Sequence, residues 1–463
     1  MHEVPQHVTW LFAGVLVLMV LALALEEKIH AKKSIITGTA AVVALFLGVA
    51  FHLLPLDKYV IDFGGGHVKH LPLYIPGVEW EVIAIILGAS LFVDVSSKSG
   101  MFSWIAIKLT RLSGGDPVRL LFFYGGMTVI FSALLNNVAA MLIVGSLTKV
   151  SLDRLGRNKL LLGFLITEGL LTNVGGLLTL ISSVPNIIVG KTAGIAFGTF
   201  FVLAAPYVVV ATVITILMGA RIFKIQPLKD AQEKKTAQEL VQGFNAADTV
   251  TSKGFFWFSA ITFIVFVLTL STTSVLPVVK DLGMGFVAMF FGLVMLLKFK
   301  SSADRKYAAL DWDLLGFFLT LFIVIDVMEH AGVLKLLGSG IAALIGVGEL
   351  SGAGLLLVAS ALTSSVTDNI PLAAVLSNIL AGLKIDPSSK LWWSVIFGSN
   401  LGGNFTPIGS ASTVVAVTLI HKAKLPMTFV GFVVRALPFA IVHVILATAY
   451  VLFVLPWLQR VLT

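Results

Sequence analysis

The sequence contains no cysteine and few charged residues, and both absences limit what the protein can be. Without cysteine it can form neither disulfide bonds nor thiolate metal sites. Charged residues make up 12% of the chain, whereas soluble domains have about 25%. No Walker motif, Ser-His-Asp arrangement, metal-binding box or cofactor loop is present. The sequence therefore predicts neither a soluble domain nor an enzyme, and it predicts no cofactor and no metal site.

Long apolar runs take the place of the missing charge. Hydrophobic residues make up 57% of the 463, and the mean hydropathy is +1.00. Crossing a hydrocarbon core of about 30 Å takes roughly 20 helical residues. We therefore expect an all-α polytopic membrane protein. The expected spans are 9–25, 34–54, 79–97, 158–190, 196–221, 254–272, 280–298, 311–330, 390–420 and 427–457.

Two further apolar stretches, 117–148 and 352–382, have a polar break in the middle and predict re-entrant hairpins. Short cytoplasmic loops are enriched in lysine and arginine. Of the 32 such residues, 24 fall on one side of the expected spans and 8 on the other. This predicts a cell-membrane protein with both termini outside and a cytoplasmic linker at 223–253. The net charge of +8 then reflects orientation, and no nucleic-acid partner is expected.

The second half of the chain resembles the first when it is shifted by 232 positions. Asp94 then meets Asp326, and Gly100 meets Gly332. Each half, 1–222 and 254–463, holds five expected spans and one hairpin, and an odd number of spans inverts the second copy. Inverted repeats with broken helices near the midplane are typical of secondary transporters, with the binding site between the repeats.

The polar breaks are where chemistry is possible. They lie in the two hairpins and in two broken helices, near 158–190 and 390–420. Interrupted helices expose backbone amides and carbonyls, and paired glycines let the chain leave helical geometry. Small polar residues also pack membrane helices together without binding anything, but recurrence at corresponding positions favours one binding site. Its candidates are Ser132, Asn136, Asn137, Asn173, Gly175, Gly176, Thr179, Ser182, Ser183, Ser364, Asn369, Asn400, Gly402, Gly403, Thr406 and Ser410.

Ionisable residues inside the membrane are costly and therefore point to function. Asp368 lies at the tip of the second hairpin and is the first candidate for coupling to protons or cations. Glu168, five residues before Asn173, is the second. A lone histidine on an apolar helix, such as His443, is more often structural.

Four segments carry a resemblance to a known group of proteins. They are 132–138 (SALLNNV), 173–186 (NVGGLLTLISSVPN), 367–372 (TDNIPL) and 400–412 (NLGGNFTPIGSAS). These segments resemble the ion transporter superfamily, in particular the ArsB-type arsenite-efflux permeases, the NhaD-type sodium/proton antiporters and the P protein. The resemblance implies a homodimer in which a transport domain moves against a scaffold, elevator fashion. It also allows a separate ATPase subunit.

Two departures from the antiporter pattern bear on the substrate. The first hairpin tip has Asn136 where those proteins carry an aspartate, and 181–183 reads Ile-Ser-Ser rather than Ile-Gly-Asp. Both missing carboxylates would have been cation ligands. Our leading hypothesis is therefore efflux of arsenite or antimonite in exchange for protons, with Asp368 as the protonated group. The alternatives are a sodium/proton antiporter using Asp368 and Glu168, a carrier for a carboxylate anion, and a channel or membrane scaffold.

Overall fold

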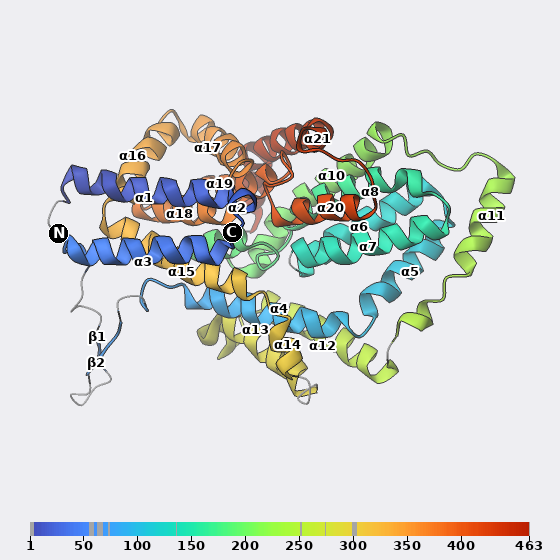
Figure 1. Ribbon diagram of the computed structural model, residues 1–463, viewed down its shortest axis with the longest axis horizontal. Helices are drawn as coiled ribbons and strands as arrows, with labels where there is room; N and C mark the ends of the chain where they lie inside the picture. The colour runs from blue at the N-terminus through green and yellow to red at the C-terminus, as the bar shows by residue number, and fades with distance from the viewer. Residues whose placement is uncertain are drawn as a thin grey trace.

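Figure 1 shows a computed structural model, which describes residues 4–54, 60–62, 68–72, 75–135, 137–250, 252–273, 275–298 and 303–462. The regular secondary structure of these residues is helical apart from one small antiparallel pair, β1 (Val60–Asp62) and β2 (Val68–His70). Eight of the described helices are long and apolar enough to cross a membrane, or nine if one bent pair forms a single span. The predicted all-α polytopic membrane fold is confirmed.

The helices of the first half and the linker are α1 (Gln6–Ala24), α2 (Glu26–Ile29), α3 (Lys33–Ala50), α4 (Trp80–Ser97), α5 (Met101–Ser113), α6 (Pro117–Leu134), α7 (Asn137–Arg154), α8 (Leu161–Gly175), α9 (Val184–Thr192), α10 (Phe197–Ile222) and α11 (Ala231–Gln242). Those of the second half are α12 (Lys253–Ser271), α13 (Val279–Lys298), α14 (Ala303–Ala308), α15 (Trp312–His330), α16 (Val333–Ile345), α17 (Glu349–Ser364), α18 (Asn369–Gly382), α19 (Lys390–Gly402), α20 (Ala411–Lys422), α21 (Phe429–Ala449) and α22 (Leu455–Leu462).

The two hairpins and the two broken helices occupy the predicted stretches. The hairpins are α6–α7 and α17–α18, and Figure 1 shows them on opposite sides of the molecule. The stretch 158–190 contains α8 and α9 with a non-helical segment, 176–183, between them. The stretch 390–420 contains α19 and α20, separated by 403–410. Each broken helix therefore places the C-terminus of one helix and the N-terminus of another inside the protein.

The glycines before the breaks act through their small size, which differs from our expectation. Gly176 and Gly403 keep right-handed backbone angles. A Cβ on Gly175 would lie 2.7 Å from the Val129 carbonyl oxygen, and one on Gly402 would lie 2.3 Å from that of Ala361. These glycines let α8 approach α6, and α19 approach α17, more closely than any side chain would allow.

The two halves exchange equivalent partners. Helix α3 packs along α15, and its counterpart α13 packs along α4. Helix α9 packs against α18 and α19, while its counterpart α20 packs against α7 and α8. This exchange is what inverted repeats would produce, and the boundaries 1–222 and 254–463 stay a prediction.

Two helices lie where we expected loops. Helices α5 and α16 follow Gly100 and Gly332, whose φ angles are +82° and +77°. Such angles favour glycine because they crowd a Cβ atom. The chain turns sharply at these residues, and α16 is bent by 80° from α15. Helices α5 and α16 each have 13 residues, which is too short for them to be recognised as membrane spans from the length of an apolar run.

The predicted linker packs on the first half of the chain. Its surface helix, α11, contacts α5, and the Leu228 backbone N–H donates to Asp116 Oδ2 at 2.8 Å. Gly100 lies so close to the linker that a Cβ would be 1.8 Å from the Thr249 carbonyl oxygen.

This contact gives a stability prediction. We expect Gly100→Ala to lower the free energy of unfolding by about 1–2 kcal/mol, because alanine is strained in a left-handed backbone conformation. Overpacking against Thr249 should lower it further, by about 1–3 kcal/mol. Gly194 is the matched control, since its φ is +66° and no atom lies within 4 Å of its Cβ position. Gly194→Ala should show only the backbone loss. Thermal unfolding of both variants in detergent is the measurement, and equal losses would contradict the close contact at Thr249.

Candidate functional site

In the first half, hydroxyl groups tie the hairpin tip to the broken helix. Ser132 Oγ donates to the Thr172 carbonyl oxygen at 2.6 Å. Thr179 Oγ1 donates to the Ala133 carbonyl oxygen at 2.5 Å. All four residues are buried, so these bonds serve buried carbonyl groups that water does not reach. The Thr172 oxygen also accepts from the Gly176 backbone N–H at 2.8 Å.

The second half repeats both bonds with equivalent residues. Ser364 Oγ donates to the Ser399 carbonyl oxygen at 2.6 Å. Thr406 Oγ1 donates to the Ser365 carbonyl oxygen at 2.6 Å. Each hairpin tip is therefore fastened to the broken helix of its own half in the same way.

Inside the first break, two side chains satisfy exposed carbonyl groups. Ser182 Oγ donates to the Gly176 and Thr179 oxygens at 2.6 and 2.7 Å. Asn186 Nδ2 donates to the same two oxygens at 2.6 and 2.9 Å. The non-helical segment is thus held in one shape by side chains of its own motif.

The two broken helices meet through reciprocal serine–asparagine bonds. Ser183 Oγ, in the first half, donates to Asn400 Oδ1 at 2.6 Å. Asn173 Nδ2 donates to Ser410 Oγ, in the second half, at 3.0 Å. Ser183 directly precedes α9 and Ser410 directly precedes α20, so each bond lies at the N-terminus of one of these helices.

Three more asparagines extend the contact. Asn400 Nδ2 donates to Asn186 Oδ1, and Asn173 Nδ2 donates to Asn404 Oδ1, both at 2.8 Å. Asn137 Nδ2 lies 3.4 Å from Asn173 Oδ1. We call these residues the amide cluster: Asn137, Asn173, Ser183, Asn186, Asn400, Asn404 and Ser410. The cluster contains donors and acceptors but no charged side chain.

The remaining neutral candidates have different surroundings. A Cβ on Gly176 would lie 2.8 Å from Asn137 Nδ2, and one on Gly403 would lie 3.1 Å from Asn173 Nδ2. Both glycines therefore border the amide cluster. Asn369 is half-buried, and its side chain makes no hydrogen bond to the residues that the structure describes. Asn136 lies outside the described residues.

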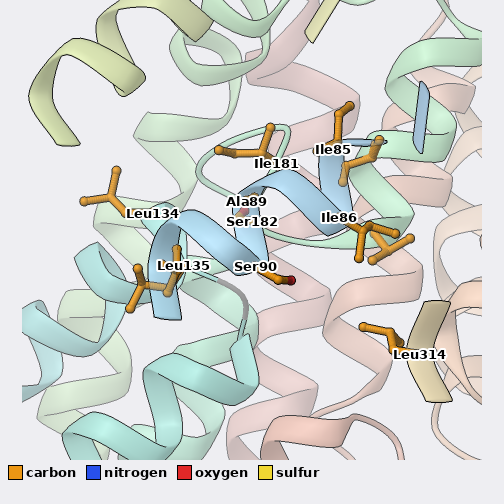
Figure 2. A pocket seen from close by; sticks show the side chains of 12 residues that line it. Ile85, Ile86, Ala89, Ser90, Leu134, Leu135, Ile181, Ser182 and Leu314 are labelled. Carbon is orange, nitrogen blue, oxygen red and sulfur yellow. The ribbon is translucent and has the colours of Figure 1, made fainter. Parts of the chain in front are cut away.

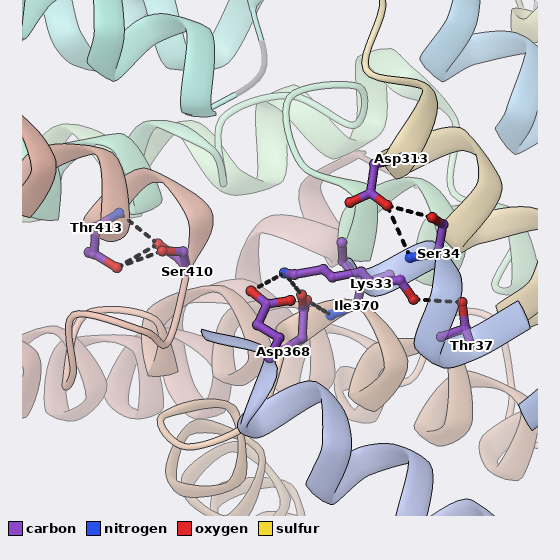
Figure 3. A network of polar contacts seen from close by, with 9 residues as sticks. Lys33, Ser34, Thr37, Asp313, Asp368, Ile370, Ser410 and Thr413 are labelled. Carbon is purple, nitrogen blue, oxygen red and sulfur yellow. Dashed lines mark hydrogen bonds and ion pairs between the residues drawn. The ribbon is translucent and has the colours of Figure 1, made fainter. Parts of the chain in front are cut away.

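Asp368 forms an ion pair with Lys33, the first residue of α3 (Figure 3). It also caps α18, since its Oδ1 accepts from the Ile370 backbone N–H at 3.0 Å. Its side chain is 13% exposed and that of Lys33 is 27% exposed. In the sequence, Lys33 directly precedes the expected span 34–54 and belongs to a loop. The structure instead makes it the charge partner of the predicted coupling residue.

Glu168 lies apart from that pair. It is fully buried in α8, and Thr148 Oγ1 donates to its Oε1 at 2.6 Å. Its other oxygen, Oε2, has no hydrogen-bond partner among the described residues. No ion pair or hydrogen bond in the described part of the chain joins Glu168 to Asp368, so the two predicted coupling residues do not form one site.

A small cavity lies between α4 and the first hairpin tip (Figure 2). Its volume is about 60 Å³, enough to hold water. Ser182 and Ser90 supply hydroxyl groups to a wall that is otherwise apolar. The other lining residues are Ile85, Ile86, Ala89, Val93, Leu134, Leu135, Ile181, Val184, Ile187 and Leu314.

Sequence reasoning missed several residues of this region. Asn186 and Asn404 stand within the motifs 173–186 and 400–412, and their type could have marked them. Nothing in the sequence around Lys33 or His443 marks their partners, because Lys33 reaches Asp368 and His443 reaches Asn404 from other helices.

The chain matches known membrane proteins over most of its length. Residues 21–398 match the protein family described as citrate transporter (CitMHS). The chain is 28% identical over 379 residues to the 46 kDa membrane protein of Mycobacterium leprae, covering 81% of this chain and 86% of that protein. It is 24% identical over 454 residues to the human P protein, covering 81% of this chain and 54% of the P protein. This likeness confirms the predicted resemblance to the P protein.

A solved structure shares the fold. The crystal structure of the YdaH transporter of Alcanivorax borkumensis matches with a TM-score of 0.56 and 14% identity, covering 91% of this chain and 98% of that one. At this identity the match bears on the fold alone, and it agrees with an all-helical transporter architecture.

Proposed function

Because the chain belongs to the citrate transporter family CitMHS, we propose that it is a secondary transporter for a small carboxylate anion of the citrate class. The observation that carries this choice is that the N-termini of α9 and α20 both border the amide cluster, since Ser183 before α9 bonds Asn400 and Ser410 before α20 bonds Asn173. Helix N-termini carry a partial positive charge and unpaired N–H groups, and so favour anions. The cluster contributes no carboxylate that would oppose an anion.

We propose that Asp368 couples transport to protons through its pair with Lys33. Protonation of Asp368 removes its negative charge and so weakens its attachment to α3. The tip of the second hairpin would then be released from α3. In the deprotonated state the pair holds the tip in place.

The cavity supports an elevator-type movement. It lies where α4 meets the hairpin tip and the broken helix of the first half (Figure 2). The facing surfaces there are mostly apolar, including Ile85 and Val93 on one side and Leu135 and Ile181 on the other. Such surfaces can slide without breaking hydrogen bonds. At about 60 Å³, the cavity would admit a citrate-sized solute only if the two parts separated.

Arsenite or antimonite efflux in exchange for protons is the second candidate. The observation that favours it is the uncharged character of the amide cluster, whose amides and hydroxyls match neutral As(OH)₃ as well as they match an anion. A sodium/proton antiporter is less well supported, because Asp368 is paired with Lys33 and Glu168 lies apart from it. We further propose that the protein resides in the cell membrane with both termini outside and forms a homodimer. A separate ATPase subunit also stays a proposal.

Transport by the purified protein in proteoliposomes tests the choice. We expect uptake of radiolabelled citrate that responds to a pH gradient, with no proton flux triggered by As(III), Na⁺ or Li⁺ alone. A pH-sensitive dye inside the vesicles reports the flux, and protein-free vesicles are the control. Proton movement triggered by As(III) alone would show that the substrate is a metalloid rather than a carboxylate. Proton movement triggered by Na⁺ or Li⁺ alone would show that it is a cation.

A further inference from the structure

His443 is a fully buried histidine at the edge of the amide cluster. It lies on α21, and its Nε2 is 2.6 Å from Thr215 Oγ1 on α10. Its Nδ1 is 3.1 Å from Asn404 Nδ2. The ring therefore connects a neighbouring helix to an asparagine of the cluster.

The partners of the ring fix its tautomer. Asn404 Nδ2 can only donate, so Nδ1 of His443 must accept. The ring proton is then on Nε2 and is donated to Thr215 Oγ1. The Thr215 hydroxyl in turn donates a hydrogen bond to the Ala211 carbonyl oxygen at 2.6 Å. The ring is neutral, and both nitrogens have partners.

The Asn404 amide is held in one orientation by two further contacts. Its Nδ2 donates to the Leu170 carbonyl oxygen at 3.3 Å, and its Oδ1 accepts from Asn173 Nδ2 at 2.8 Å. Turning this amide over would place its oxygen against the Leu170 oxygen. It would also place its nitrogen against that of Asn173, so the two amides can turn over only together.

The orientation of the Asn404 amide also determines the hydrogen bonds between the two broken helices. Asn173 Nδ2 points toward Ser410 Oγ, and its Oδ1 accepts from Ser412 Oγ at 3.2 Å. A ring with its proton on Nδ1 would require Asn404 to turn its oxygen to the ring. Asn173 would then have to present its oxygen toward Asn404 and its nitrogen toward Ser412.

We propose that His443 is a positioning residue of the solute site: its Nδ1 lone pair orients the Asn404 amide, which in turn orients the Asn173 amide between the two broken helices. This inference rests on the proposed function, because it assumes that the solute binds against the amide cluster. His443 does not touch the solute in this arrangement. Together with the Leu170 carbonyl group, it determines whether Asn173 offers a donor or an acceptor at each of its positions.

Two substitutions at the same position separate positioning from packing. In His443→Asn, the side-chain oxygen stands one bond from Cγ, as Nδ1 does, and can still accept from Asn404. In His443→Gln, the amide reaches the position of Nε2, so the contact to Thr215 is kept and that to Asn404 is lost. Thr215→Val is the matched control, since it removes the other partner of the ring and leaves Asn404 untouched.

Citrate uptake kinetics in proteoliposomes provide the readout, with thermal unfolding of each variant measured in parallel. We expect His443→Gln to raise the KM at least about 10-fold, because a buried donor of Asn404 loses its acceptor. His443→Asn and Thr215→Val should keep the KM within about threefold of the wild type, even where they lower thermal stability. Equal KM increases in Thr215→Val and His443→Gln would overturn the positioning role and leave a structural one.

A second measurement separates this inference from the proposed function. ¹⁵N NMR of the histidine-labelled protein should show, for the signal that disappears in His443→Gln, a protonated Nε2 and an unprotonated Nδ1. A proton on Nδ1 would overturn the inference whatever the protein transports. Wild-type vesicles that take up As(III) but no citrate would overturn the carboxylate proposal alone, and the variants would then be compared with As(III). Wild-type vesicles that take up neither would overturn both the proposed function and the positioning role.

Discussion

Replacing Asp368 by asparagine is expected to abolish uptake driven by a pH gradient, with a loss of at least about 100-fold, or about 2.7 kcal/mol. Asparagine has the shape of aspartate and can still cap α18. Its side-chain amide, however, neither takes up a proton as a carboxylate does nor forms an ion pair with Lys33. Uptake with and without a pH gradient across the vesicle membrane is the measurement. Asp386 lies in an exposed loop, and Asp386→Asn is the matched control that should keep gradient-driven uptake.

The partner of Asp368 makes this prediction sharper. Lys33→Met leaves the Asp368 carboxylate without its cation, and the loss of one partner from a partly buried pair should cost about 1–3 kcal/mol of stability. The double variant Lys33→Met/Asp368→Asn removes both charges and should recover most of that loss. It should still fail to respond to a pH gradient. Gradient-driven uptake by Asp368→Asn or by the double variant would exclude Asp368 as the coupling residue.

Replacing Asn173 by aspartate is the second change with a large expected effect. The substitution keeps the shape of the side chain but turns a donor into an acceptor. The new oxygen would face Asn404 Oδ1 at 2.8 Å and Ser410 Oγ at 3.0 Å. It would also add a charge to a fully buried position. We expect citrate uptake to fall at least about 100-fold.

Asn378 provides the matched control for this change. It lies on α18, is half-buried, and its Nδ2 donates to the Ala374 carbonyl oxygen. Asn378→Asp therefore has the same chemistry outside the amide cluster and should lose little uptake. Size-exclusion profiles in detergent would verify that both variants are folded. Ser410→Ala removes one acceptor of Asn173 without adding charge and should lose about 10-fold. Wild-type uptake by folded Asn173→Asp would exclude the amide cluster from transport.

The fold was predictable where the sequence pattern was long and local. Apolar runs of span length predicted the membrane helices, polar breaks within apolar stretches predicted both hairpins, and polar motifs with paired glycines predicted both broken helices. Helices α5 and α16 were not predicted, because each has only 13 residues and follows a turn at a left-handed glycine. Apolar length does not detect a helix of this kind.

The site was predictable by motif but not by partner. Asn173, Asn400, Ser183 and Ser410 stood out because polar residues are rare in apolar helices, and the structure joins all four across the two halves. The partner of each side chain depends on how the two halves pack, and the spacing of residues in the sequence does not predict this packing. The pairing of Lys33 with Asp368 is the clearest case, since 335 positions separate them in sequence.

Labelling of a single cysteine tests most directly whether the solute binds beside the broken helices. The chain has no cysteine, so Ser182→Cys introduces the only thiol, at the wall of the cavity next to α4. Ser339, exposed on α16, gives the matched control Ser339→Cys. We predict that citrate slows the reaction of the thiol in Ser182→Cys with a membrane-permeant reagent and leaves that in Ser339→Cys unchanged. Unchanged labelling of Ser182→Cys, in protein that still takes up citrate, would contradict a binding site at this position.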